Sequence, residues 1–446
     1  MYKRQAHNVQ PVFRGFTTAA LPICGYSAAQ LRAAYGVTWA NTGRGQTVAL
    51  TESEAPTAMA LALKDYAKAN DLPLPKAGQY RQINAGGGGQ CPTAAVPSDQ
   101  AAASDQASAS LEAASSYDDE SEMDSEAVYA MAPDAKQLMV IGTGCDEEQS
   151  RLNATLAVLT GNGHHPSASI VSNSWHSSAY PAAAHAIDVR AAAEGVGLYF
   201  ASGDGPGASG TEEDPFAVVV GGTTLGIGAR NQRVLETGWS DDSAYLYQDA
   251  WDDEGIGGSA AGGGTSLTFR QPVYQKGVVP PSMSHVRMSN GVVVADRAVP
   301  DISAVADTDS AMLVGHLGTT AAGKPGGYLT QTTGGTSLAT PLIAGLVADA
   351  QQGQPSSFGF TNPLLYRLAG TSALRDVLPI STSMPQPYRA AYVPPATSTD
   401  SARIDVFDAQ QHPDTQQVTA TGYDTMTGIG TPNGVAFIAG LRRLAR

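Results

Sequence analysis

Basic residues are scarce in this chain of 446 residues. It has 26 Lys and Arg against 41 Asp and Glu, which gives a formal net charge of −15 at pH 7. Charged residues make up only 15% of the sequence, against roughly 25% in an average soluble domain. Without a basic face nothing neutralises a phosphate backbone, so the composition excludes nucleic acid as a partner. The surplus of carboxyl groups suits an acidic medium, where they begin to neutralise.

Long apolar runs are also missing, and only three cysteines occur. No stretch approaches the roughly 18 apolar residues needed to cross a bilayer, so we expect no membrane partner. The basic start at residues 1–4 is not followed by an apolar leader, and we expect either a cytosolic protein or one whose leader was removed. Cys24, Cys91 and Cys145 allow one disulfide, and their spacing fits no zinc site.

Glycine (49 residues) and proline (27) are abundant, and 42% of residues are hydrophobic, which is typical of a compact, loop-rich globular protein. Strands and helices alternate between residues 47 and 220, which predicts a parallel α/β sheet in one large domain. The predicted strands are 46–51, 137–141, 169–174, 197–202 and 216–220, and the predicted helices are 57–70, 147–160 and 180–194. Residues 96–118, rich in Ala, Ser, Asp and Gln, indicate a surface insertion. Beyond about 225 we expect irregular chain, until a long apolar helix starts near Ser337.

The strongest local motif is Gly-Gly-Thr-Ser-Leu-Ala-Thr-Pro at 334–341, which precedes an apolar run. Two glycines permit a sharp turn, and Ser337 would stand at a helix N-terminus, where the helix dipole favours developing negative charge. Alternatively, Thr336 or Ser337 only caps a buried helix. Similar sequences occur at 221–224, where no serine follows the threonine, and at 263–266, where no proline and no predicted helix follow.

A serine nucleophile needs a base. The chain has eight histidines, and none is followed by glycine, so the His-Gly-Thr motif of subtilisins is absent. Among them only His176, after Trp175, is a candidate to reach a cleft.

Residues 118–126 are strongly acidic and offer another base. One interpretation is a solvated helix start, stabilised by the helix dipole. Glu120 and Asp124 lie four residues apart, however, on one face of a helix. Repulsion between like charges raises one pKa and lets the two groups share a proton, which predicts an acid–base pair.

Four motifs in order resemble those of the sedolisins, the serine-carboxyl peptidases with a subtilisin-like fold. The sedolisin helix motif E-x-x-L-D is matched at 120–124, with Met123 in place of Leu, and the nucleophile motif at 334–341. The strand motif S-x-S-W is matched at 172–175. The oxyanion motif A-x-G-D-S-G is matched in part at 201–207, without the serine after Asp204.

The resemblance implies a serine-carboxyl peptidase in which Glu120 takes the proton of Ser337 and returns it to the leaving amine. Asp124 would orient Glu120 and share its proton, and a protonated Asp204 would donate to the oxyanion. A carboxylate serves as base at acid pH, where histidine is already protonated. Glu52 and Trp175 match supporting positions of some sedolisins, and a purely structural part is equally open for both.

A calcium site is also implied by the resemblance. Residues 420–430 resemble the sedolisin segment G-x-G-x-D-x-x-T-G-x-G, with alanine in place of the first glycine. The implied ligands of one calcium ion are two carboxylates and three carbonyls, from Asp376, Asp424, Val377, Ala420 and Gly422. Calcium prefers such mixed oxygen ligands. Without the resemblance, the segment is also typical of a Gly-rich turn with surface aspartates.

We therefore predict an α/β protein with a subtilisin-like parallel sheet and helices on both faces. Residues 1–24 would be an N-terminal extension, 25–446 the mature peptidase domain, and 376–434 its calcium segment. The expected activity is a secreted, extracellular, acid-active endopeptidase, a monomer made as a zymogen with its own propeptide and acting on proteins or peptides. The alternatives are a tripeptidyl-peptidase, a neutral subtilisin-like hydrolase, and an inactive calcium-stabilised binding module.

The cysteines flank the acidic segment, and we predict a bridge between Cys91 and Cys145. In the chain-entropy model a loop of about 53 residues contributes roughly 4 kcal/mol to stability. Cys24 would then be free here or paired with a cysteine of a removed upstream segment.

Overall fold

The computed structural model describes residues 25–85, 120–208, 210–247, 250–253, 259–308, 310–319, 325–379, 389–392, 403–407 and 417–446, with two short strands at 12–13 and 19–20. The predicted insertion at 96–118 lies outside the described residues, as do Cys24 and Cys91. Within the described residues, no helix combines the length and the apolar character that crossing a membrane requires.

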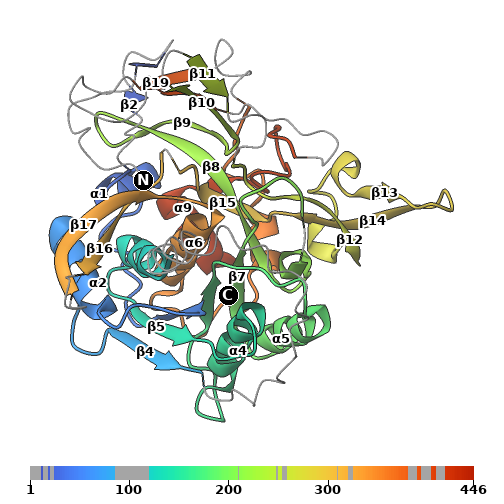
Figure 1. Cartoon of the computed structure of the whole chain (residues 1–446). Helices are drawn as coiled ribbons and strands as arrows, with labels where there is room; N and C mark the ends of the chain where they lie inside the picture. The colour runs from blue at the N-terminus through green and yellow to red at the C-terminus, as the bar shows by residue number, and fades with distance from the viewer. Residues whose placement is uncertain are drawn as a thin grey trace, which may run out of the picture.

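A central parallel sheet organises the molecule (Figure 1). Seven parallel strands follow the order β15-β8-β7-β6-β3-β5-β4. Their bounds are β3 Thr47–Glu52, β4 Tyr80–Asn84, β5 Lys136–Ile141, β6 Ile170–Asn173, β7 Gly197–Ala201, β8 Val218–Gly228 and β15 Ile302–Val305. Short antiparallel strands, β2 (Ala19–Ala20) and β9 (Arg233–Gly238), extend it along β8. The predicted sheet is confirmed.

Helices cover both faces of this sheet. One face carries α1 (Ala28–Ala34), α2 (Met59–Ala69), α6 (Thr336–Gln351), α9 (Gly434–Leu444) and the helix that includes residues 120–131, which share one apolar core. The other face carries α4 (Glu147–Thr160) and α5 (Pro181–Ala193), packed through a second core. The predicted two-faced arrangement is therefore confirmed, and the predicted bounds of α4 match the structure.

The prediction of irregular chain after residue 225 is wrong, because this part of the chain is rich in strands. β8 continues to Gly228, and β16 pairs with β17 in a long hairpin. Glycine and threonine dilute the apolar alternation that would reveal these strands in the sequence. The remaining elements are β1 Val12–Phe13, β10 Asp241–Tyr247, β11 Ala250–Asp253, β12 Gly264–Arg270, β13 His285–Arg287, β14 Val293–Val299, β16 Met312–Thr319, β17 Pro325–Thr333, α7 Asn362–Leu365, β18 Leu374–Arg375, β19 Arg389–Tyr392, β20 Arg403–Phe407 and β21 Thr431–Pro432.

Helix α6 runs through the core and packs on β15, β8, β7 and β6. Its sequence is apolar all round, as expected for a helix with no solvent face. Every residue of α6 is buried except Ser337. The helix thus presents a single partly accessible side chain, at its first turn.

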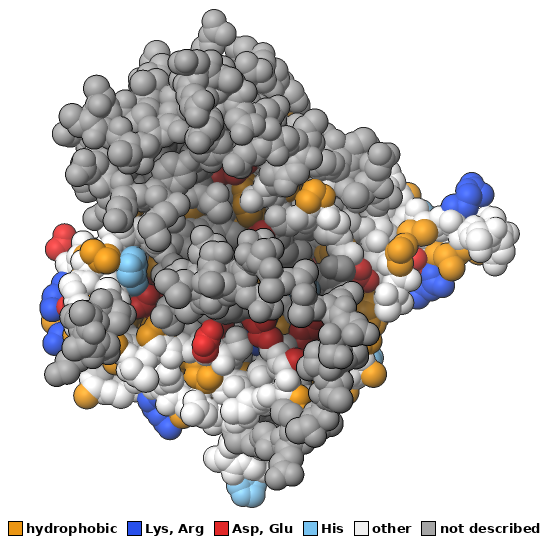
Figure 2. All heavy atoms as spheres, in the orientation of Figure 1, with side chains coloured by type: hydrophobic (Ala, Val, Ile, Leu, Met, Phe, Trp, Pro, Cys, Tyr) orange, Lys and Arg blue, Asp and Glu red, His pale blue; other side chains and the backbone are white. Residues whose placement is uncertain are grey.

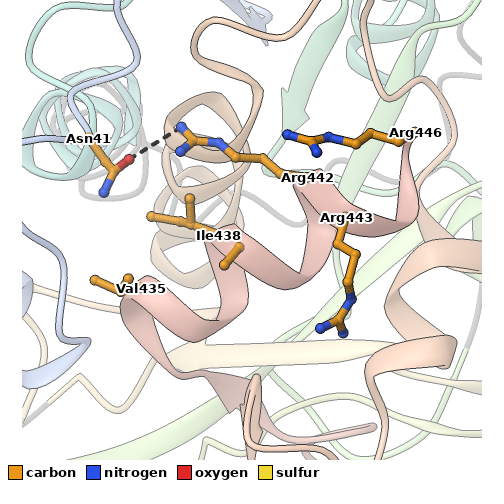
Figure 3. Close-up of a pocket in the computed structure, with 7 residues that line it drawn as sticks. Asn41, Val435, Ile438, Arg442, Arg443 and Arg446 are labelled. Carbon is orange, nitrogen blue, oxygen red and sulfur yellow. Dashed lines mark hydrogen bonds between the residues drawn. The ribbon is translucent and has the colours of Figure 1, made fainter.

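The far end of α6 is fixed by α9. The guanidinium of Arg442 donates to the carbonyls of Asp349, Ala350 and Gln352. Carbonyls at the end of a helix have no backbone N–H partner within the helix. The guanidinium also donates to Asn41 Oδ1, beside a surface hollow lined by Arg443 and Arg446 (Figure 3). A cation at this position complements the negative end of the helix dipole.

Asp349, in the last turn of α6, is fully buried. Burial raises its pKa from 3.8 to about 8, against the attraction of Arg32 on α1 and Arg442 on α9 and a contact with the amide of Gly43. The folded state therefore keeps a proton that the unfolded chain releases. Its contribution to stability is fully present below pH 3.8 and is lost as the pH rises towards about 8.

We predict that Asp349→Asn flattens the pH dependence of stability. The wild-type free energy of unfolding should fall by up to about 1.4 kcal/mol per pH unit across this window through Asp349 alone. The variant should gain most over wild type at neutral pH, in urea unfolding measured from pH 4 to 8. Asp65→Asn, at a partly exposed position of α2, is the control. Equal slopes in wild type and Asp349→Asn would contradict the prediction.

Candidate active site

Ser337 stands in the first turn of α6, immediately after a backbone that only glycine adopts easily. Gly335 has φ 97°, a conformation that costs other residues steric strain. A Cβ there would also lie 2.6 Å from Asp204 Oδ2. The second glycine of the motif therefore brings Asp204 against the start of the nucleophile helix.

The acidic helix is buried and not solvated. Residues 121–131 are buried, including Glu122, Asp124 and Glu126, so the interpretation as a solvated helix start is wrong. The hydroxyl of Ser337 hydrogen-bonds to the carboxyl of Glu120. Oε1 of Glu120 has no partner among the described residues. The predicted nucleophile and base are thus in direct contact, and one carboxyl oxygen of the base has no hydrogen-bond partner among the described residues.

The pKa values of three neighbouring carboxyl groups are raised, in each case mainly by burial. For Glu120 burial and the charge of Asp204 outweigh the Ser337 hydrogen bond and Arg151, and the pKa rises to about 7. For Glu52 burial and the charge of Glu120 raise the pKa to about 8. For Asp124 burial raises the pKa well above 3.8, helped by Glu52 and Glu120. All three groups therefore hold their protons to higher pH than free carboxyl groups do.

Asp204 lies against the first turn of α6. Its Oδ1 accepts hydrogen bonds from Thr336 N (2.7 Å) and Thr336 Oγ1 (2.8 Å), which leaves Oδ2 to carry a proton. Burial raises the pKa of Asp204, against these two hydrogen bonds and the nearby His176. A protonated carboxyl donates a hydrogen bond, whereas an ionised one only accepts. The geometry therefore suits a donor beside the nucleophile.

Glu52 and Trp175 support the site in different ways. Glu52, at the end of β3, is 4% exposed and hydrogen-bonds to Asp124. Trp175 donates through Nε1 to Thr51 O and Oγ1 and packs edge-on against Phe200 at 5.3 Å. Glu52 thus joins the carboxyl cluster, and Trp175 fixes the backbone that presents it.

Thr336 and Ser174 contribute to the site in ways that the sequence does not predict. Thr336 links the two sides of the site, because its Oγ1 accepts from Gly203 N and donates to Asp204. Ser174, noted only as a motif letter, contacts Asp124 at 2.9 and 2.8 Å. Neither carries a signal of its own in the sequence, since Ser and Thr are common at such turns.

Acidic side chains gather across the middle of the face shown in Figure 2, while basic ones lie at its edges. This agrees with the charge balance of the sequence, and on this face no basic patch interrupts the acidic region among the coloured residues.

Four of the five implied calcium ligands, Asp376, Ala420, Gly422 and Asp424, are joined by hydrogen bonds at one turn. The carboxylate of Asp376 accepts from Gly422 N at 3.0 Å, and that of Asp424 from Ala420 N at 3.0 Å. Val377 follows Asp376 and is buried. Asp424 also accepts from the amides of Met426 and Thr427 and from the Thr427 hydroxyl.

The carboxylate of Asp376 is a suitable oxygen ligand for calcium. The carboxylate oxygens of Asp424, in contrast, already accept hydrogen bonds from the protein. The described residues hold no cluster of three or more His, Cys, Asp or Glu side chains suited to a metal. The implied calcium site would not form such a cluster, because it has only two carboxylates and takes its other three ligands from backbone carbonyls.

Cys145 is disulfide-bonded. Its predicted partner Cys91 lies outside the described residues, as does Cys24, and the pairing stays a prediction.

We predict that Thr336→Val destabilises the protein while Thr336→Ser does little. Valine keeps the shape but leaves the Gly203 amide without its acceptor and Asp204 without one donor. Lost and unsatisfied hydrogen bonds of this kind cost about 1–3 kcal/mol. Urea unfolding at acid pH measures the difference, and equal stabilities of the two variants would contradict it.

Comparison with known proteins connects this geometry to a family. A model of the subtilase family matches residues 100–417. Kumamolisin of Bacillus sp. (strain MN-32) is 28% identical over 333 residues, which are 71% of this chain and 49% of that protein. Tripeptidyl-peptidase sed5 of Aspergillus fumigatus is 29% identical over 242 residues, 52% of this chain and 33% of that protein. The chain therefore spans half or less of the length of these relatives.

The fold has a solved counterpart. The structure of Pseudomonas sedolisin, a serine-carboxyl proteinase, in complex with two molecules of pseudo-iodotyrostatin aligns with a TM-score of 0.62 at 20% identity. The alignment covers 95% of this chain and 99% of that one. At this identity the likeness concerns the fold, which is the subtilisin-like α/β arrangement predicted above. The chain belongs to the subtilase family, and the resemblance to the sedolisins that its motifs predict is confirmed.

Proposed function

We propose that this protein is a serine-type endopeptidase, active at acid pH, whose base is a carboxylate. The observation that carries the proposal is the hydrogen bond between the Ser337 hydroxyl, at the start of a buried helix, and the half-buried Glu120. Among the described residues no histidine hydrogen-bonds to Ser337. His176 acts on Asp204 through its charge and is exposed.

In the proposed reaction Ser337 Oγ attacks the carbonyl carbon of the scissile peptide bond while Glu120 takes the hydroxyl proton. The carbonyl electrons move to its oxygen, and Asp204 donates a hydrogen bond there. Glu120 then protonates the leaving amine as the C–N bond breaks, which leaves an ester on Ser337. Water attacks this ester with Glu120 as base, and the acid product and free Ser337 result.

The surroundings of the carboxyl groups support these assignments. Burial raises the pKa of Glu120 to about 7, while the hydrogen bond from Ser337 and the charge of Arg151 favour its ionised form. Glu120 is therefore the group placed to take the Ser337 proton, with Asp124 and Glu52 beside it in the cluster. Asp204 must stay protonated to donate, and burial raises its pKa. We expect activity to be lost as the pH rises and Asp204 ionises.

The substrates we propose are proteins and peptides. The protein's own propeptide would be removed at maturation, in an extracellular, acidic medium. The active form would be a monomer. A tripeptidyl-peptidase is the alternative, because one relative carries that name. An inactive binding module would not need the Ser337–Glu120 contact, which is intact here.

We further propose one calcium ion at the turn formed by Asp376, Val377, Ala420, Gly422 and Asp424. Support comes from the two carboxylates that reach the same turn. When bound, the ion would tie residue 376 to the 420–424 segment and strengthen the fold. It would take no part in peptide cleavage.

We predict that Ser337→Ala and Glu120→Gln each lower kcat on a denatured protein substrate by about 10⁴-fold or more. Both remove a group from the reacting pair, and both should leave the melting temperature at acid pH nearly unchanged. Glu122→Gln is the matched control, since it makes the same change at a buried position of the same helix. Retained activity in Ser337→Ala would move the nucleophile elsewhere and contradict the proposal.

Chelation should lower the melting temperature of the wild-type protein. Binding to the folded state alone adds about 2.7 kcal/mol at a hundredfold excess of calcium over its Kd. Asp376→Ala should be less stable and insensitive to chelator, and elemental analysis should find about one calcium per wild-type chain. An unchanged melting temperature with no metal found would leave Asp376 and Asp424 as ordinary turn residues.

A further inference from the structure

Ser174 connects three elements of the site. It follows β6, and its Oγ lies 2.9 and 2.8 Å from Asp124 Oδ1 and Oδ2 on the acidic helix. The same Oγ lies 3.0 Å from the backbone carbonyl oxygen of Ser337 on α6. One hydroxyl thus touches the supporting acid and the backbone of the nucleophile.

The carbonyl of Ser337 needs such a donor because of Pro341. In an α-helix the N–H of residue i+4 donates to the carbonyl of residue i. Position 341 of α6 is proline, which has no N–H, so the helix supplies no donor for Ser337 O. A buried carbonyl without a partner is costly, and the hydroxyl of Ser174 takes the place of the missing amide.

The hydrogen atoms of this contact can be counted. A serine hydroxyl has one hydrogen to donate. If it goes to Ser337 O, the contact between Ser174 and Asp124 must be made by a hydrogen on Asp124. The chain of hydrogen bonds runs from Asp124 to Ser174 to Ser337 O and requires Asp124 to be protonated.

When Asp124 ionises, its carboxylate attracts the hydrogen of Ser174 and the Ser337 carbonyl loses its donor. The charged groups around Asp124 favour the protonated form. Glu52 on β3 and Glu120 on its own helix repel a negative charge. Asp204 acts on Glu120 across the site, and Arg151 on α4 attracts both Glu52 and Glu120.

We propose that Ser174 is a positioning residue, which holds the first turn of α6 and thereby Ser337 in place as long as Asp124 carries a proton. The inference rests on the proposed peptidase function of the same site. It adds a backbone link from the supporting acid to the nucleophile, alongside the side-chain link through Glu120.

The test compares single and double variants. Ser174→Ala should lower kcat about tenfold, the effect of one hydrogen bond, with KM little changed. Pro341→Ala restores an N–H that donates to Ser337 O, so Ser174→Ala combined with Pro341→Ala should recover most of the loss. The control is Ser172→Ala on β6, whose Oγ is buried and has no hydrogen-bond partner among the described residues. It should behave like wild type.

A second readout does not depend on activity. Amide hydrogen exchange of Leu338 and Ala339, whose amides donate to Gly335 O, reports on the first turn of α6. The exchange rate of these amides should be higher in Ser174→Ala than in wild type. In wild type the rate should also increase as the pH rises towards neutrality, by more than the intrinsic pH dependence of amide exchange. Pro341→Ala should remove both effects.

The possible results distinguish the positioning role of Ser174 from the peptidase function of the site. If Ser174→Ala matches Ser172→Ala in kcat and exchange, the positioning proposal is wrong even though Ser337→Ala is inactive. A loss that Pro341→Ala fails to rescue would assign Ser174 to Asp124 alone and also overturn the backbone link. If wild type and Ser337→Ala are equally active or equally inactive while exchange behaves as expected, the peptidase assignment fails and the structural link stands.

Discussion

Burial of carboxyl groups around one helix is the constraint on which this structure depends. Water stabilises an ionised carboxylate strongly, and a protein interior does so only with matched donors. Glu52, Glu120 and Asp124 lie together near Ser337, and each has a raised pKa because of burial. Asp349 repeats the pattern at the other end of α6. The folded state is therefore most stable where these groups keep their protons, which is at acid pH.

Helix α6 turns this constraint into geometry. Its first turn is held by Gly335, which admits Asp204, and by Thr336, which binds it. Its last turn is held by Arg442. Between them, apolar packing on both sides leaves Ser337 as the one residue of α6 that is not buried. A helix fixed at both ends holds Ser337, the proposed nucleophile, at a defined place relative to Glu120, which is the preorganisation that catalysis needs.

The sequence predicted the parallel sheet, the helices on its faces and the four residues that the structure brings together. Periodicity sufficed for α4, and the spacing of Glu120 and Asp124 predicted a shared helix face. The strands after residue 225 were missed because glycine and threonine obscure their alternation. The burial of Asp124 was not visible either, since a run of acids is ordinarily solvated. Ser174 and Pro341 are far apart in sequence, and only the fold reveals that one replaces the hydrogen bond that the other removes.

The central claim is that a carboxylate, with a protonated Asp204 opposite, performs the chemistry that histidine performs in neutral serine peptidases. The most direct measurement is the dependence of kcat/KM on pH for the wild-type protein with a denatured protein substrate, from pH 3 to pH 9. The account predicts a bell-shaped profile with its maximum on the acid side of neutrality and loss of activity as the pH rises and Asp204 ionises. A profile that rises through pH 7 to an alkaline plateau, as a histidine base gives, would contradict it.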